Sequence, residues 1–352
     1  MAINTGLLRA LTQTPGIASR EDAVRALVRT ELQSLVDDIT VDVMGNLLGT
    51  RRGTGGPRVA IAAHMDEIGF VVRHIDDAGF LRLQRVGGFD PRVLVAQRVA
   101  VSTRTGAALS GVLQLASKPI HLQQPGDTKE TRLEDLFVDL GLPVEAVNRQ
   151  VEIGDMVTLD RDLAELGETI VSKALDDRLG VFVMIEALRK SRGSAATVVA
   201  VASTQEEVGL RGAMTAAHQV DADVAIAPDV TIAGDIPGSP PSDVVTRLGG
   251  GTAIKLMDSS HIPHPGLVDH LRDIAERNQI PFQLEILPAG GTDAASFQKS
   301  QGGAVAGTIS IPTRYVHTVN EMAHLTDIQA SIDLLAAFVD EAGTRSYVDS
   351  SD

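Results

Sequence analysis

Two hydrophobic patterns alternate along most of the chain. Residues 19–37 (SREDAVRALVRTELQSLVD) repeat apolar positions at helical spacing, and residues 57–64 (PRVAIAAH) form a short run of small and β-branched residues. The first pattern predicts an amphipathic helix capped by Ser19, with Asp22 three positions further on. Residues 38–50 (DITVDVMGNLLGT) then alternate like a hairpin, and the run at 57–64 is typical of a strand covered on both faces, as in a parallel sheet.

The same alternation of strand and helix fills the C-terminal half of the chain. Strands separated by helices indicate a doubly wound sheet with right-handed crossovers. We expect helices over residues 179–192, 267–279 and 325–343, and strands over residues 196–204, 221–229, 281–287 and 306–311.

Between these regions the pattern changes to short alternating segments that are broken by Gly and Pro, with one helix predicted over residues 130–141 (ETRLEDLFVDLG). The sequence therefore predicts an α/β protein with a doubly wound mixed sheet flanked by helices, formed by residues 1–71 and 164–352. Residues 72–163 are predicted to form an inserted small β-rich domain, barrel-like or PDZ-like.

Composition excludes several classes of function. Cysteine is absent from the 352 residues, which rules out disulfides, thiolate zinc sites and a cysteine nucleophile. A net charge of -15 argues against a nucleic-acid partner, and 3% aromatic residues leave few platforms for stacking bases or sugars. The N-terminus lacks the pattern of a signal peptide, and no apolar run approaches the ~18 residues of a membrane span. We therefore expect a cytoplasmic protein without a membrane partner.

Acidic and histidine residues follow the ends of the predicted strands. In open α/β sheets, ligands bind beyond the carboxyl ends of the strands. Taken singly, each residue has a structural explanation, such as a helix cap or a solvated surface group. Together at one sheet edge they would repel each other unless they shared a cation. The residues are His64 and Asp66, Glu206 and Glu207, Asp229, His317, and the pair Asp176 and Asp177 at a helix start.

Nitrogen and carboxylate ligands without thiolates suit zinc, cobalt or manganese. Two such ions ~3.5–4 Å apart need a bridging carboxylate and lower the pKa of a shared water. Asp66 lies two residues past His64, on the same side of an extended chain, and can orient the imidazole. The side chains of Glu206 and Glu207 diverge, so that one can bind metal while the other acts as general base.

Six segments in one order resemble the tetrahedral (TET) aminopeptidases, co-catalytic metallopeptidases that include glutamyl aminopeptidases and proteins described as endoglucanases. They are AAHMDEIGF, SKALDDRLG, STQEEVGLRGA, AIAPDVTIAGDIPG, GGTDAASF and ISIPTRYVHT. The resemblance implies a cis peptide bond after the bridging aspartate. It also implies one metal on His64, Asp176 and Asp229, a second on Asp176, Glu207 and His317, Glu206 as general base and Asp66 as the residue that orients His64.

The resemblance further implies a metal-dependent aminopeptidase with two divalent ions per subunit, zinc before cobalt or manganese, that removes N-terminal residues from short peptides. It implies a homo-oligomer, a tetrahedral dodecamer built from dimers through the inserted domain, with active sites facing an interior chamber. After His317 this chain reads TVNEM, where the family more often has Ser-Pro. We expect this difference to alter the loop beside the site and the substrate preference.

Two other functions stay open at this point. A glycosidase would use two carboxylates without a metal, and a non-catalytic assembly protein on the same fold would tolerate loss of Glu206. The chain contains no G-x-S-x-G segment, which argues against a serine hydrolase. His261 and His264 in SSHIPHP are interpreted as loop residues and not as a second metal pair. GGTDAASF is interpreted first as a helix cap and second as part of a substrate pocket. The preferred N-terminal residue and the physiological metal cannot be derived from the sequence.

Overall fold

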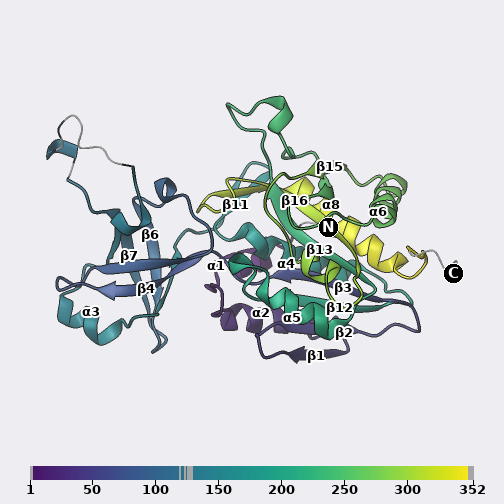
Figure 1. Ribbon diagram of the computed structural model, residues 1–352, viewed down its shortest axis with the longest axis horizontal. Coiled ribbons are helices and arrows are strands. Elements are labelled where there is room, and N and C mark those ends of the chain that lie inside the picture. Colours follow the sequence, from purple (N-terminus) through teal and green to yellow (C-terminus); the bar gives the residue numbers. More distant parts are fainter. Residues whose placement is uncertain (1–2, 119, 123, 125–129, 348–352) are drawn as a thin grey trace. The chain divides into compact units, whose positions relative to one another are not determined.

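The computed structural model describes residues 3–118, 120–122, 124 and 130–347, which form two compact units (Figure 1). The larger unit contains the described parts of Met1–Glu67, Leu163–Val316 and Asn320–Asp352. The smaller unit contains the described parts of Ile68–Asp162 together with His317–Val319. The division into residues 1–71 and 164–352 against 72–163, and the role of the insertion in dimerisation, stay predictions.

The larger unit is built on a single mixed sheet, which confirms the predicted fold class. Its central strands β12, β3, β13 and β16 run parallel to one another, the pairs β1–β2, β2–β12, β16–β17, β17–β11, β11–β10 and β16–β14 are antiparallel, and β15 pairs parallel with β14. Within the described residues the order is β1-β2-β12-β3-β13-β16-β17-β11-β10, and β14 and β15 continue from β16. The strands are β1 (Asp38–Val41), β2 (Leu47–Arg51), β3 (Arg58–His64), β10 (Ala164–Leu166), β11 (Thr169–Ser172), β12 (Thr197–Ser203), β13 (Val224–Ile232), β14 (Thr252–Met257), β15 (Phe282–Ile286), β16 (Val305–Arg314) and β17 (Glu321–His324).

Helices cover both faces of this sheet (Figure 1). In β3, Val59, Ile61 and Ala63 pack into the core of one face, and Ala60 and Ala62 pack into the core of the other. A strand that alternates between two dry faces must be apolar at every position, which explains the pattern of residues 57–64. The first face carries α1 (Thr5–Gln13), α2 (Asp22–Leu32), α4 (Leu175–Lys190), α6 (Pro265–Arg277) and α8 (Leu325–Glu341), and the second carries α5 (Arg211–Val220) and α7 (Ala294–Gln298).

The helix predicted over residues 19–37 is shorter than expected, and Ser19 is not its cap. Helix α2 begins at Asp22 and ends at Leu32, with Glu21 in the N-cap position. Ser19 lies outside the helix with a φ of 72°, in the left-handed region. A turn closed by the hydrogen bond from the Arg20 N–H to the Ile17 carbonyl oxygen therefore precedes the helix in place of the predicted capping box.

The smaller unit is a closed barrel in the order β4-β5-β8-β7-β6-β9, with its own apolar core. The helix predicted over residues 130–141 is wrong. This segment holds a single 3-10 turn, η3 (Leu133–Asp135), and then β8, in which Leu136 and Val138 are buried at alternate positions. Pairing with β5 and β7 gives this segment its strand conformation. The elements are β4 (Gly69–Ile75), β5 (Leu81–Val86), β6 (Gln97–Ser102), β7 (Ala108–Leu115), β8 (Leu136–Asp139), α3 (Val144–Gln150) and β9 (Met156–Leu159).

Among the described residues, no helix combines the length and the apolar character that crossing a membrane requires.

Candidate metal centre

The candidate metal centre lies where the neighbouring strands β3 and β13 stop pairing. Strand β12 stays paired with β3 as far as Ser203 opposite His64. The pairing of β13 with β3 ends earlier, at Ile226 opposite Ile61. The carboxyl ends of β3 and β13 are therefore free of each other at the level of His64, which leaves space for side chains between them.

Asp177, at the start of α4, occupies this position. Its carboxylate accepts hydrogen bonds from the backbone N–H of His64 at 3.3 Å and of Gly180 at 2.9 Å. A Cβ atom on Gly180 would lie 2.3 Å from the carbonyl oxygen of Pro228 in β13. Only glycine allows this close approach of helix and strand. The first turn of α4 is thereby fixed against the ends of both strands.

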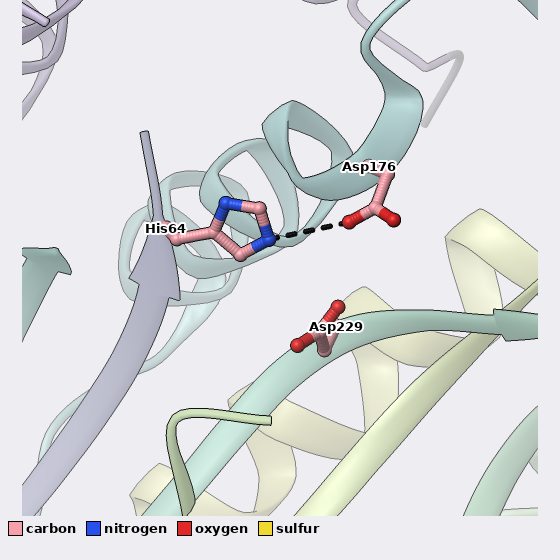
Figure 2. A group of neighbouring side chains, drawn as sticks. All are labelled: His64, Asp176 and Asp229. Carbon is pink, nitrogen blue, oxygen red and sulfur yellow. Dashed lines mark hydrogen bonds and ion pairs between the residues drawn. The ribbon is translucent and has the colours of Figure 1, made fainter. Parts of the chain in front are cut away.

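Three side chains converge at this point (Figure 2). His64 ends β3, Asp229 lies in β13, and Asp176 lies in the first turn of α4, where its backbone departs from helical geometry. The His64 Nε2 atom lies 3.2 Å from Asp176 Oδ1, and one potential ligand atom from each residue lies within 4.8 Å of the others. The Asp176–Asp177 peptide bond is cis, as the resemblance implied.

Glu206 and Glu207 follow β12 in the short 3-10 turn η4 (Glu206–Val208). The Glu206 Oε2 atom lies 3.8 Å from His64 Nε2. A carboxylate oxygen of Glu207 lies within 4.8 Å of one of Asp176. The adjacent glutamates thus approach different members of the centre, and the division of roles between them stays a prediction.

Asp66 contacts both His64 and the turn that carries the glutamates. The backbone carbonyl oxygen of Asp66 lies 3.0 Å from His64 Nδ1, and its carboxylate lies 3.4 Å from the same nitrogen. A proton on Nδ1 can be donated to that carbonyl, which leaves Nε2 facing Asp176. The Asp66 carboxylate accepts the backbone N–H groups of Glu206 at 3.0 Å and Glu207 at 3.2 Å.

His317 follows β16 with a φ of 65° and belongs to the smaller unit. There its ring lies beside Gly88, where a Cβ atom would be 3.3 Å from His317 Nδ1. The absence of a side chain at Gly88 makes room for the ring. The role of His317 as a ligand of the second ion stays a prediction.

The charges around His64, Asp229 and Glu206 favour the binding of cations. Burial raises the pKa of Asp229 well above its ordinary value, and the charges of Asp176 and Asp293 add to this effect. Burial likewise raises the pKa of Glu206. Burial alone would lower the pKa of His64, but the charge of Glu206 and hydrogen bonds to Asp176 and Asp66 raise it well above its ordinary value. A dry excess of carboxylates beside an imidazole is the ligand set of divalent metal ions, and these residues fit them.

Asp293 is a buried acid of this region that the sequence did not indicate as a candidate site residue. It takes the N-cap position of α7, as the interpretation of GGTDAASF as a helix cap predicted, but its side chain makes no capping hydrogen bond. One of its oxygens instead accepts from the hydroxyl of Ser203, and the other has no hydrogen-bond partner among the described residues. Burial raises the pKa of Asp293 to about 6. The sequence signal was an acid among small residues, which did not distinguish a cap from a buried group.

His261 and His264 have structural roles. His261 is buried, with its Nδ1 atom 3.0 Å from Asp258 and its Nε2 atom 3.2 Å from the Thr308 hydroxyl. The ring of His264 accepts the backbone N–H of Gly266 and caps α6. Both contacts agree with the interpretation of SSHIPHP as a loop.

Comparisons with known proteins agree on one family. The model of the M42 glutamyl aminopeptidases matches residues 45–334. The lysyl aminopeptidase of Pyrococcus furiosus is 34% identical over 347 residues, which covers 95% of this chain and 96% of that protein.

Two solved structures are similar over almost the full length. The aminopeptidase APDkam598 of Desulfurococcus kamchatkensis is 43% identical with a TM-score of 0.92, and 96% of this chain and 94% of that chain are covered. The Pyrococcus horikoshii TET1 peptidase, described as assembling into a tetrahedron or a large octahedral shell, is 32% identical with a TM-score of 0.84. That likeness covers 96% of this chain and 99% of that one.

Proposed function

The chain belongs to the M42 glutamyl aminopeptidase family, and we propose that it removes single residues from the N-termini of short peptides with the help of two divalent metal ions. The observation that carries this proposal is the convergence of His64, Asp176 and Asp229 in a dry space at the carboxyl edge of the sheet. The charge of the surrounding acids suits cations, and zinc is the first candidate among the metals that this ligand set accepts.

One ion would be held by His64, Asp176 and Asp229, and the other by Asp176, Glu207 and His317, with Asp176 shared. When bound, such a pair of ions polarises a peptide carbonyl and lowers the pKa of a water toward ~7. The protein supplies the ligands, keeps the site dry and places a base next to it.

Glu206 acts as the general base in this proposal. It accepts a proton from the attacking water as the water oxygen bonds to the scissile carbonyl carbon, and it delivers that proton to the leaving amine as the C–N bond breaks. Asp66 supports both partners, because its carbonyl faces His64 Nδ1 and its carboxylate holds the backbone of Glu206. The free N-terminus of the product peptide leaves as a neutral amine and is protonated in solution.

We expect activity to depend on the metal and on a free N-terminus. The chelator-stripped enzyme should not cleave aminoacyl chromogenic substrates, and zinc, cobalt or manganese added singly should restore cleavage. N-acetylated versions of the same substrates serve as the matched control and should stay intact. A panel of side chains in this assay identifies the preferred N-terminal residue. Cleavage of the aminoacyl substrates that survives the chelator would contradict the metal dependence, whereas chelator-resistant hydrolysis of a chromogenic glycoside would favour a glycosidase.

We also propose that the chain forms a homo-oligomer, a dodecamer built from dimers through the inserted domain. The described assemblies of the Pyrococcus horikoshii TET1 peptidase support this proposal. An enclosed chamber would admit unfolded peptides and exclude folded proteins. Light scattering coupled to size-exclusion chromatography should give a mass near twelve chains, and a monomer at micromolar concentration would contradict the proposal.

A further inference from the structure

Glu21 connects the N-terminal segment to the turn that carries Glu206. Its side chain is buried, with 3% of the residue exposed. One carboxylate oxygen accepts the backbone N–H of Ser19 at 2.9 Å and the backbone N–H of Gln205 at 3.1 Å. Ser19 and Gln205 both have left-handed backbones, with φ values of 72° and 57°. Residues with a side chain rarely adopt this conformation, so each requires support from its surroundings.

Gln205 determines the direction in which the chain leaves β12. It stands between that strand and Glu206, and its N–H is the second of four consecutive backbone donors that side chains hold, after the N–H of Thr204, which donates to the Asn46 side chain. Glu21 accepts from Gln205, and Asp66 accepts from Glu206 and Glu207. Two carboxylates from distant parts of the sequence therefore fix the backbone of the whole turn.

The segment that presents Glu21 is itself anchored. The guanidinium of Arg178, which is fully buried, donates to the carbonyl oxygens of Leu11 at 2.5 Å, Thr14 at 2.8 Å and Gly16 at 3.2 Å. Arg178 lies in α4, close to Asp176, so the N-terminal segment is tied to the same helix that supplies a candidate ligand. This anchoring holds the segment in place, so that the Glu21 carboxylate stays where it accepts the N–H of Gln205.

We propose that Glu21 is a positioning residue for Glu206. By holding Gln205 in the left-handed conformation, it keeps the Glu206 carboxylate at the place from which the proton is transferred. The inference rests on the proposed function, because it assumes that Glu206 is the base. Glu21 itself touches neither the substrate nor the metal ligands in this assignment.

The nature of the contact indicates which substitutions are informative. Glutamine keeps an oxygen that can accept both backbone N–H groups, whereas alanine removes it. Burial, and after it the charge of Asp66, raises the pKa of Glu21 to about 7, so a neutral side chain is readily accommodated here. Glycine at position 205 adopts a positive φ without steric cost and needs no external support.

The test compares Glu21→Ala, Glu21→Gln, the double variant Glu21→Ala/Gln205→Gly and Glu206→Gln in the metal-loaded oligomer. We expect Glu21→Ala to lower kcat by about 10-fold to 100-fold, as for a displaced catalytic group, with KM and metal content close to wild type. Glu21→Gln should recover most of the lost kcat. The double variant should recover part of it, which a general loss of stability would not explain.

Three outcomes would overturn the inference: wild-type kcat in Glu21→Ala, a Glu21→Gln variant as slow as the alanine variant, or a loss of kcat that follows a loss of metal. An active Glu206→Gln variant would overturn the proposed function instead, so the two failures are distinguishable. Should Glu21→Ala not fold, Glu21→Asp takes its place. It keeps the charge but withdraws the carboxylate from Gln205 by one methylene, and normal kcat in that variant would equally refute the role.

Discussion

Replacing Glu206 with glutamine should lower kcat by about 10²-fold to 10⁴-fold, the range that a positioned general base contributes. The amide has nearly the shape of the carboxylate but cannot accept the proton of the attacking water. The substitution keeps the backbone contacts of the turn, because the N–H groups of Glu206 and Glu207 are held by Asp66. We therefore expect the melting temperature and the metal content to stay at wild-type values. Steady-state kinetics and elemental analysis of the same preparation measure both quantities.

Glu207→Gln is the matched control, since it makes the same chemical change one residue further along. In the proposed assignment Glu207 is a ligand, and this variant should lose affinity for one metal ion, so that added metal restores part of its activity. Added metal should not restore Glu206→Gln. Near-normal hydrolysis by Glu206→Gln would remove Glu206 from its role, and identical responses of both variants to metal would show that the two glutamates are not divided in function.

The strand ends of the centre could be predicted because they depend on local patterns. An apolar run such as residues 57–64 indicates a central strand, and parallel strands bring their carboxyl ends to one edge. That reasoning grouped His64 and Asp229 with the other acids and histidines at strand ends, whereas the set of His64, Asp229 and Asp176, which lies at a helix start, was implied by the family resemblance. The structure brings these three side chains close together. The same patterns predicted the mixed sheet and the β-rich insertion, since each strand carries its own periodicity.

Features that depend on distant contacts could not be predicted. Ser19 matched a capping residue, but Glu21 takes the cap position and also bonds to Gln205, 184 residues away. Asp293 takes a helix-cap position, but its carboxylate accepts from Ser203 at the end of β12 and not from the helix backbone. In each case the local rule was outweighed by a hydrogen bond that exists only in the folded chain. Helical spacing over residues 130–141 was misleading for a related reason, because pairing in the barrel determines β8.

The structure adds contacts of Asp66 that the sequence did not indicate. The sequence indicated it as the residue that orients His64, and its backbone carbonyl does face the imidazole. Its carboxylate, however, forms its shorter contacts with the N–H groups of Glu206 and Glu207, at 3.0 Å and 3.2 Å, against 3.4 Å to the ring. In the proposed assignment, the orientation of His64 and the placement of Glu206 thus depend on the same residue, Asp66, through its backbone carbonyl and its carboxylate respectively.

Replacing Asp176 with alanine should have the largest effect on metal binding. If its carboxylate is shared, both ions lose a ligand at once, whereas Asp229→Ala removes a ligand from only one. We expect purified Asp176→Ala to hold less than one ion per chain and Asp229→Ala to hold about one. Metal ions contribute several kcal/mol of charge stabilisation to the transition state, so their loss from Asp176→Ala should lower kcat/KM by at least about 1,000-fold.

Elemental analysis of the two variants, purified in parallel with the wild type, distinguishes a shared ligand from a single one. Asp177→Asn is the control for disturbance of this turn, because Asp177 faces the backbone of His64 and Gly180 and belongs to neither proposed ligand set. It should retain both ions even where its stability falls. Equal metal content in Asp176→Ala and Asp229→Ala would contradict the bridging assignment. If Asp176 is shared, its loss must affect both ions, whereas the loss of Asp229 affects only one.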